Sequence, residues 1–184
     1  KYCHPNNHVN LSQSTNDAYP SAMKIAFYRY IGDLIKSLER LVEAFEIKSK
    51  EFSHVIKMGR TQLQDAVPMT LGQEFEAFAY TLKEEVQRIR QNREHFLEIN
   101  MGATAIGTGI NSDPDYTPLV TRHLADITGI PLVEAKNMIE ATSDTGVFVM
   151  NSSTVKRLAI KLSKISNDLR LLSSGPRTGL NEIN

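Results

Sequence analysis

The chain has 184 residues, and its 21 Lys and Arg residues balance 21 Asp and Glu residues, so the formal net charge is zero. A neutral chain lacks the long-range attraction that draws proteins to nucleic acid or to an anionic membrane, and no apolar run approaches the roughly 20 residues that cross a bilayer. The 41% of hydrophobic residues argues against disorder, while the single cysteine, Cys3, excludes an internal disulfide and is typical of a cytoplasmic protein.

Three long stretches carry apolar residues at alternating steps of three and four. This spacing averages 3.5 residues, the period of a helix face that packs against a partner helix. Helices of this length have little to pack against in a short chain, so we expect an all-α long-helix bundle that completes its core with other helices. The predicted helices lie at about 18–52, 71–99, 117–128 (the shorter one) and 143–172, within one incomplete helical-bundle domain spanning residues 1–184.

Local signals mark the ends of these helices. Thr70 and Gln73 have capping-box spacing at the start of the second long helix. Pro118 opens the shorter helix and Gly129 closes it. The connections, including residues 53–69, show no strand pattern and are expected to be irregular.

The first polar connection contains SQSTND at residues 12–17, directly before the first long helix. The free N–H groups and partial positive charge at a helix N-terminus make such a position an anion site. The alternative, which spacing alone favours, is a polar loop in which Asn16 or Asp17 caps the helix.

The second connection reads GRTQLQDAVP at residues 59–68 and combines a guanidinium, a hydroxyl and two amides. Such a loop can bind a carboxylate, or it can be an ordered connection in which Arg60 is paired with an acid. The third connection, at 102–109, is glycine-rich but lacks the Walker lysine, so tight turns are favoured over a phosphate cradle. His4 and His8 are four apart around Pro5, a poor helical pair, and no metal site is predicted.

Five longer strings resemble the aspartase/fumarase superfamily. Within it they are most similar to the family of aspartate ammonia-lyases, and the resemblance covers essentially the whole chain. The strings are SQSTNDAYP (12–20), GRTQLQDAVPMTLGQEF (59–75), GATAIGTGIN (102–111), EATSDTGVFV (140–149) and KISNDLRLLSSGPRTGLNEIN (164–184).

The resemblance implies a homotetramer with a central helical bundle and active sites shared between subunits. It implies reversible deamination of L-aspartate to fumarate and ammonia, in which a base removes a proton beside the β-carboxylate and neutral donors hold the resulting dianion. The expected partner is therefore a small dicarboxylate. No cofactor is expected to be required, and activation by a divalent cation is left open.

Carried onto this chain, the resemblance places Ser14, Thr15 and Asn16 in one substrate-binding loop and Thr61 and Gln62 in another. The Thr61 hydroxyl is expected to donate to a substrate carboxylate. Gln62 stands where fumarases carry histidine, which counts against a class II fumarase and agrees with aspartases.

The resemblance also implies that functional segments lie outside the chain. The family's GSSxMPxKxNP loop, with its base serine, would follow Asn184, and an amino-terminal domain would precede Lys1, so we expect a central fragment that is inactive alone. No catalytic residue is therefore assigned within it. His4 and Asn6 match the segment of a secondary dicarboxylate site in fumarases and are candidates for such a site.

Two alternatives compete with this interpretation. One is a class II fumarase, which would hydrate fumarate to malate. The other is a non-catalytic helical assembly module, which the apolar periodicity alone would favour, although such a module has no need of a polar loop as particular as GRTQLQDAVP.

Overall fold

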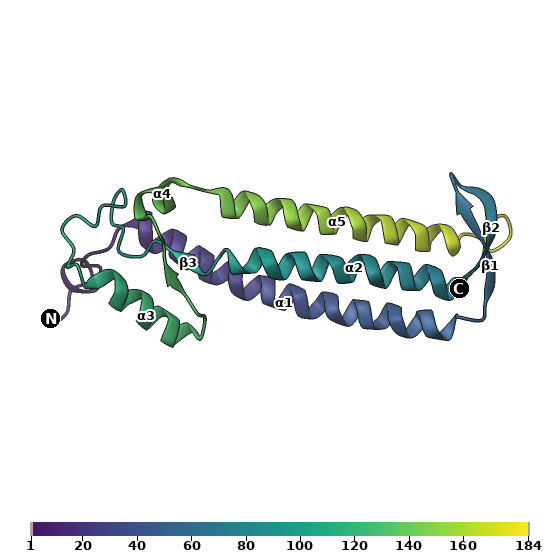
Figure 1. Ribbon diagram of the computed structural model, residues 1–184, viewed down its shortest axis with the longest axis horizontal. Coiled ribbons are helices and arrows are strands. Elements are labelled where there is room, and N and C mark those ends of the chain that lie inside the picture. Colours follow the sequence, from purple (N-terminus) through teal and green to yellow (C-terminus); the bar gives the residue numbers. More distant parts are fainter. Residues whose placement is uncertain (1, 184) are drawn as a thin grey trace. The chain divides into compact units, whose positions relative to one another are not determined.

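Three long helices dominate the fold of the chain, of which a computed structural model describes residues 2–183. They are α1 (Thr15–Glu51), α2 (Leu71–Glu94) and α5 (Gly146–Leu172), and the prediction of an all-α class is confirmed (Figure 1). The shorter elements are η1 (Pro5–Val9), β1 (Ile56–Thr61), β2 (Gln64–Thr70), β3 (Glu98–Ile99), α3 (Tyr116–Thr128), β4 (Val133–Glu134) and α4 (Met138–Ser143).

Two of the predicted helix ends follow from the local signals. The Thr70 N–H donates to Gln73 Oε1 at 2.9 Å, and the Gln73 N–H donates to Thr70 Oγ1 at 3.1 Å, which confirms the capping box before α2. Gly129 ends α3 with a φ of 66°, and its N–H donates to the Ala125 carbonyl at 2.9 Å. Glycine adopts this left-handed conformation without the steric penalty of a Cβ atom.

The second long helix is shorter than its apolar spacing predicts, because it ends at Glu94 and not near Ile99. Phe96 continues the spacing but lies in the turn that follows, where it is fully buried. Its ring stacks on that of Phe27 at 5.3 Å between centroids and meets the edge of Phe148 at 5.9 Å. Phe96 is therefore buried by its tertiary contacts, although its backbone is not helical.

The chain divides into two compact units. The first combines the residues up to Gly32 with Gln91–Asn151, and the second combines Asp33–Arg90 with the residues from Ser152 onward. In the first unit β3 and β4 form a short parallel pair, and an apolar cluster packs beside it. The buried members of that cluster are Ile99, Met101, Ile130 and Leu132.

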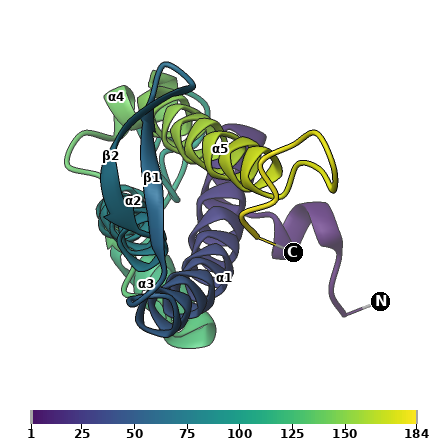
Figure 2. The same ribbon diagram turned by 90° about the vertical axis from the view of Figure 1, so that its right-hand side faces the viewer.

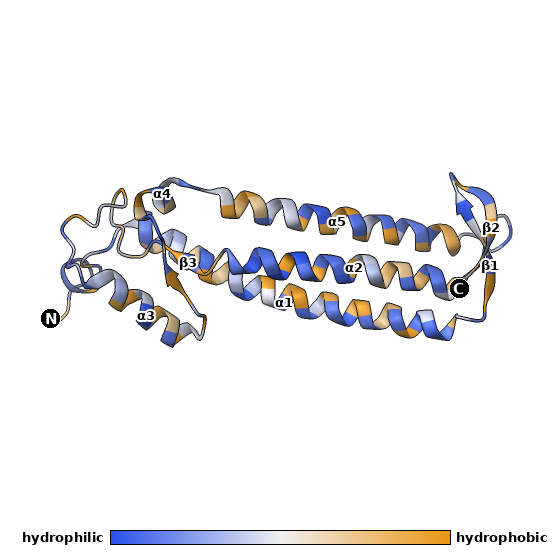
Figure 3. Cartoon of the chain, viewed as in Figure 1, coloured by the Kyte–Doolittle hydropathy of each residue, from blue (hydrophilic) through white to orange (hydrophobic). Residues whose placement is uncertain are grey.

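In the second unit, portions of α1, α2 and α5 lie side by side, with apolar residues interspersed among polar ones along each helix (Figure 3). Phe45 of α1 meets Phe75 and Phe78 of α2, at 5.9 and 5.7 Å between ring centroids. Other residues buried in this unit are Leu82, Val86, Ile89, Leu158 and Ile165. Among residues 2–183, no helix combines the length and apolar composition needed to span a membrane.

One carboxylate lies inside this second unit. Glu85 of α2 is 0% exposed, and α5 supplies Lys161 Nζ at 2.6 Å and Arg157 Nη2 at 2.9 Å, while Arg88 Nη1 lies at 3.2 Å. Burial opposes ionisation, but the hydrogen bonds from Lys161 and Arg157 outweigh it and hold the pKa of Glu85 below its ordinary value. The ionised group therefore joins α2 to α5.

The expectation of an irregular connection at 53–69 is wrong, because β1 and β2 form an antiparallel hairpin (Figure 2). Its two-residue turn consists of Gln62 and Leu63, with φ values of 52° and 61°. Hairpin turns of this kind usually carry Asn or Gly, so no residue type marked the turn in the sequence. Gly59 lies at the register shift in β1, where an added Cβ would come within 2.9 Å of the Val67 carbonyl oxygen.

We expect Glu85→Gln to lower the free energy of unfolding at neutral pH by about 2 kcal/mol, because the charge-assisted hydrogen bonds to the buried carboxylate are lost while its partly exposed cations regain water. The folded-state pKa of Glu85 lies below the ordinary 4.5, so this contribution is complete above that pH and is lost as the pH falls through the folded-state pKa. Urea denaturation between pH 7 and pH 3.5 measures both effects.

Glu84→Gln is the matched control on the same helix. The Glu84 carboxylate lies 3.9 Å from both Arg88 and Lys161 and is partly exposed, so its loss should cost less than about 1 kcal/mol. Two results would contradict the stabilising role of ionised Glu85. One is an equal loss of unfolding free energy in the two variants. The other is a difference in unfolding free energy between wild type and Glu85→Gln that stays the same in acid.

Candidate functional site

The first predicted loop is held by side-chain caps at the start of α1. Ser14 Oγ accepts the Asn16 N–H at 3.1 Å, and Asp17 Oδ1 accepts the Ser14 N–H at 2.9 Å. The bond from the Ser14 N–H is that of a capping box, while Ser14 Oγ caps the second N–H of the helix and not the third. The cap residue is therefore Ser14, and the expectation that Asn16 or Asp17 caps the helix is wrong.

The same loop is joined to the glycine-rich connection. Asp17 is 0% exposed, and its second oxygen, Oδ2, accepts the Thr104 N–H at 2.8 Å. The Asn16 side-chain amide donates to the Ala105 carbonyl at 2.7 Å. Gly102 has a φ of 93°, in agreement with the prediction of tight turns there. One buried carboxylate thus holds both connections.

A proline supplies a further link. Pro20 lies inside α1 and has no N–H to donate to the Asn16 carbonyl, the position a helical hydrogen bond would require. The Asn100 side-chain amide donates to that carbonyl instead, at 3.0 Å, and also to Thr142 Oγ1 at 3.1 Å. Asn100 is fully buried, so this contact ties the start of α1 to two other segments of the first unit.

The arrangement leaves donors for an anion. A serine hydroxyl carries one proton and two lone pairs, and the Asn16 N–H occupies only one lone pair of Ser14 Oγ. The Ser14 proton therefore remains free to donate, beside the exposed Thr15, whereas the Asn16, Asp17 and Ala18 N–H groups already donate to Ser14. Neutral donors at a helix N-terminus are suited to a carboxylate.

His4 and Asn6 lie in the same unit, on the surface. His4 Nδ1 accepts the Asn6 and Asn7 N–H groups at 3.2 and 3.3 Å and so caps η1, while the His4 N–H donates to His8 Nδ1 at 2.8 Å. Residues 2–183 contain no group of three or more His, Cys, Asp or Glu side chains arranged to hold a metal ion. The secondary dicarboxylate site stays a prediction.

Thr61 and Gln62 lie in the second unit, at the exposed tip of the β1–β2 hairpin. Thr61 ends β1 and is paired with Gln64 across the turn. Gln62 lines a cavity of about 330 Å³, together with Lys57 and Arg60 of β1. A hydroxyl and an amide thus project from one tip, and neither carries a charge.

The alternative interpretation of Arg60, an ion pair with an acid, is what the structure shows. Arg60 Nη2 lies 2.5 Å from Glu182 Oε1, and Lys57 Nζ lies 3.1 Å from Glu182 Oε2. Burial opposes ionisation of Glu182, but hydrogen bonds from Arg60 and Lys57 outweigh it and lower the pKa of Glu182. The hydrogen bond to Glu182 also raises the pKa of Arg60. No local spacing pointed to Glu182, because its partners are distant in the sequence.

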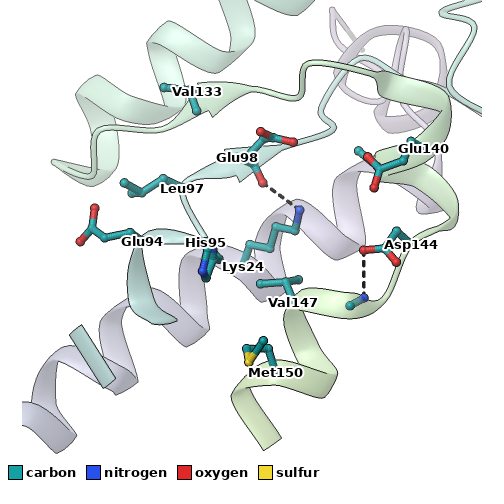
Figure 4. Close-up of a pocket in the computed structure, with 12 residues that line it drawn as sticks. Lys24, Glu94, His95, Leu97, Glu98, Val133, Glu140, Asp144, Val147 and Met150 are labelled. Atoms are coloured by element: carbon teal, nitrogen blue, oxygen red, sulfur yellow. Dashed lines mark hydrogen bonds between the residues drawn. The ribbon is translucent and has the colours of Figure 1, made fainter. Parts of the chain in front are cut away.

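A second cavity, of about 490 Å³, lies in the first unit (Figure 4). Lys24 of α1 lines it, and the Lys24 ammonium donates to the Glu98 carbonyl at 2.8 Å. Burial lowers the pKa of Lys24, and the charges of Glu98, Glu140 and Asp144 oppose that shift. The acidic lining suits a cationic group. None of the predicted site residues lines this cavity, although part of its lining comes from the string EATSDTGVFV at residues 140–149.

The profile of the family described as Lyase matches residues 1–184, so the chain belongs to that family. Aspartate ammonia-lyases from Helicobacter pylori (strain ATCC 700392 / 26695) and Escherichia coli (strain K12) are both 59% identical to it over 184 residues. The match covers 100% of this chain but only 39% and 38% of those proteins, so the chain spans well under half their length.

Solved structures agree with this assignment. A fumarate lyase:delta crystallin from Brucella melitensis, solved bound to cobalt, is 54% identical with a TM-score of 0.95, over 97% of this chain and 39% of that chain. A recombinant class II fumarase from Schistosoma mansoni is 33% identical with a TM-score of 0.93, over 97% of this chain and 40% of that one. The resemblance to the aspartase/fumarase superfamily is confirmed.

We expect Asp17→Asn to loosen the first loop. An amide has one acceptor oxygen where the carboxylate has two, so either Ser14 or Thr104 must lose its acceptor, at a cost of about 1–3 kcal/mol. Hydrogen exchange of those two backbone N–H groups should accelerate. Asp126→Asn, at an exposed position on α3, is the control and should leave both rates unchanged. Unchanged protection in Asp17→Asn would show that the carboxylate does not hold the loop.

Proposed function

We propose that the chain is part of a carbon–nitrogen lyase that reversibly deaminates L-aspartate to fumarate and ammonia. The observation that carries the proposal is its 59% identity to aspartate ammonia-lyases across all 184 residues. The neutral donors found at the α1 N-terminus and at the hairpin tip support a dicarboxylate as the substrate.

The reaction sets a clear electrostatic requirement. Removal of the proton beside the β-carboxylate leaves two negative charges on that end of the molecule, after which the C–N bond breaks, the C=C bond forms and the amine leaves. A donor aimed at the developing charge contributes roughly 3–4 kcal/mol to such a transition state. Hydroxyl and amide donors do this without introducing a competing charge. We expect no cofactor to be required.

Within this scheme, the residues of the chain bind and orient the substrate. Ser14, with its proton free, and Thr15 and Asn16 at the start of α1 form one set of ligands for a carboxylate. The Thr61 hydroxyl and the Gln62 amide form another. The first set lies in the first unit and the second set lies in the second unit. Each set is therefore positioned by the packing of its own unit.

Gln62 favours deamination over hydration. A fumarase needs a titratable group to handle the proton of water, and the resemblance assigns that part to a histidine at this position. The Gln62 amide does not titrate at physiological pH, so it cannot act as an acid or a base. A class II fumarase is therefore the weaker candidate.

We also infer that the complete protein is a homotetramer with active sites shared between subunits, and that it is cytoplasmic. In the second unit α5 exposes apolar side chains, among them Val155 and Ile160, with Ala159 between them. Exposed apolar side chains on a long helix support its contact with other helices, although Lys156 lies among them. The free thiol of Cys3 fits a reducing compartment.

Thr61→Ala in the full-length protein should lower kcat/KM for L-aspartate about tenfold or more, because a hydrogen bond to a charged carboxylate is lost. The loss should appear as a higher KM, a lower kcat or both. Formation of fumarate, followed by its ultraviolet absorbance, measures the rate.

Ser53→Ala removes an exposed hydroxyl from the turn before β1 and should have no effect. Unchanged kinetics in Thr61→Ala would remove Thr61 from the site. Conversion of L-malate without activity on L-aspartate in the wild type would favour the fumarase alternative.

Ile160→Glu should dissociate the full-length protein into smaller species, because it places a charge on an apolar position that helices of other subunits would cover. Ile160 is 60% exposed in the chain, and Ile127 of α3 is 81% exposed, which makes Ile127→Glu the matched control. Sedimentation analysis measures the assembly. A tetramer that survives Ile160→Glu, or equal dissociation in the control, would contradict this role for α5.

A further inference from the structure

The hairpin tip has little apolar packing to hold it. The residues of β2 from Gln64 to Pro68 are exposed, and so are Thr61, Gln62 and Leu63. The backbone ladder is interrupted by the register shift between Met58 and Arg60. Both turn residues also have positive φ, a conformation that non-glycine residues hold only where the surroundings impose it.

An acid from outside the hairpin meets β1 at two points. Lys57 and Arg60 lie three residues apart on the strand, and the Glu182 carboxylate contacts both of them, at 3.1 and 2.5 Å. The three side chains are largely buried, with Glu182 19% exposed. Such a two-point, charge-assisted contact fixes orientation as well as distance.

Glu182 itself is held in place. It lies in the stretch that follows α5, and its N–H donates to the Leu172 carbonyl at 2.9 Å. The preceding Asn181 N–H donates to the Ser174 carbonyl at 2.7 Å. The stretch therefore folds back on the end of α5 and presents the carboxylate from a fixed backbone.

Within the part of the chain that the structure describes, no other acid forms so short and so buried an ion pair with Arg60. Asp65 Oδ1 lies 3.9 Å from Arg60 Nε, and its side chain is 77% exposed, so the pair is long and solvated. Lys57 has a second partner in Glu74, at 2.5 Å, so its position does not depend on Glu182 alone. The contact that depends on Glu182 is the one at Arg60, next to Thr61.

We propose that Glu182 is a positioning residue for substrate binding, acting through Arg60 to hold Thr61 and Gln62 at the hairpin tip. The inference rests on the proposed function for the identity of the substrate. It assigns to the stretch after α5 a part in forming the substrate site: a carboxylate that contacts no substrate fixes the donors that do.

The test compares variants of the full-length protein that contains this chain. Glu182→Gln should raise KM for L-aspartate about tenfold or more with a smaller change in kcat, because misplaced binding groups weaken substrate binding while correctly bound substrate still reacts. Hydrogen exchange of the backbone N–H groups of residues 61–65 should accelerate at least tenfold. Glu182→Asp, which keeps the charge on a shorter side chain, should give an intermediate KM.

Two comparisons separate positioning from general loss of stability. Glu85→Gln also removes a buried carboxylate with lysine and arginine partners in the second unit, but away from the hairpin, and should leave KM and exchange at residues 61–65 unchanged. Arg60→Gln combined with Glu182→Gln should raise KM no further than the larger single effect, because the two residues act as one unit.

Several results would overturn the proposal. They are unchanged KM and unchanged exchange in Glu182→Gln, additive effects in the double variant, or an equal rise in KM in Glu85→Gln. A lower kcat at constant KM in Glu182→Gln would also overturn it, because that result indicates a smaller folded fraction. If the wild type fails to deaminate L-aspartate, the proposed function fails, and the exchange measurement still decides whether Glu182 holds the tip.

Discussion

A buried carboxylate needs hydrogen-bond donors or cations beside it, and this constraint determines which main segments of the chain contact one another. Asp17 takes the N–H groups of two connections, Glu85 takes cations from α5, and Glu182 takes cations from β1. Each acid joins segments that are distant in the sequence. Apolar packing supplies most of the stabilisation of such helices, while the acids select which faces and loops meet.

The long helices could be predicted because their signal is local and repeated. An apolar residue at every third or fourth position indicates a helix wherever its partner lies, and the Thr70–Gln73 pair marks a start within one turn. The same signal fails where tertiary packing replaces helical backbone. Phe96 continues the apolar spacing after α2 has ended, because its partners Phe27 and Phe148 bury it in a turn.

The residue types of the candidate site could be predicted from the sequence, but the long-range contacts that hold those residues could not. Ser14 and Thr61 are neutral donors in polar connections, and the resemblance of the strings around them to the aspartase/fumarase superfamily assigns them to the candidate site, which stays a prediction. The hairpin beneath Thr61 was missed because its turn residues carry no turn signature, and Glu182 because an ion pair across the fold leaves no spacing to detect. Long-range partners of this kind are determined only once the chain has folded.

Pro20 has a consequence for the order in which the chain folds. The carbonyl of Asn16 finds its donor in Asn100, a residue 84 positions further along the chain, and not within α1. A helix can begin to form on its own from the residues after Pro20, but the turn that carries Asn16 completes its hydrogen bonds only when Asn100 arrives. The segment with the first predicted ligands is therefore expected to become ordered late, after the body of the helix on which it stands.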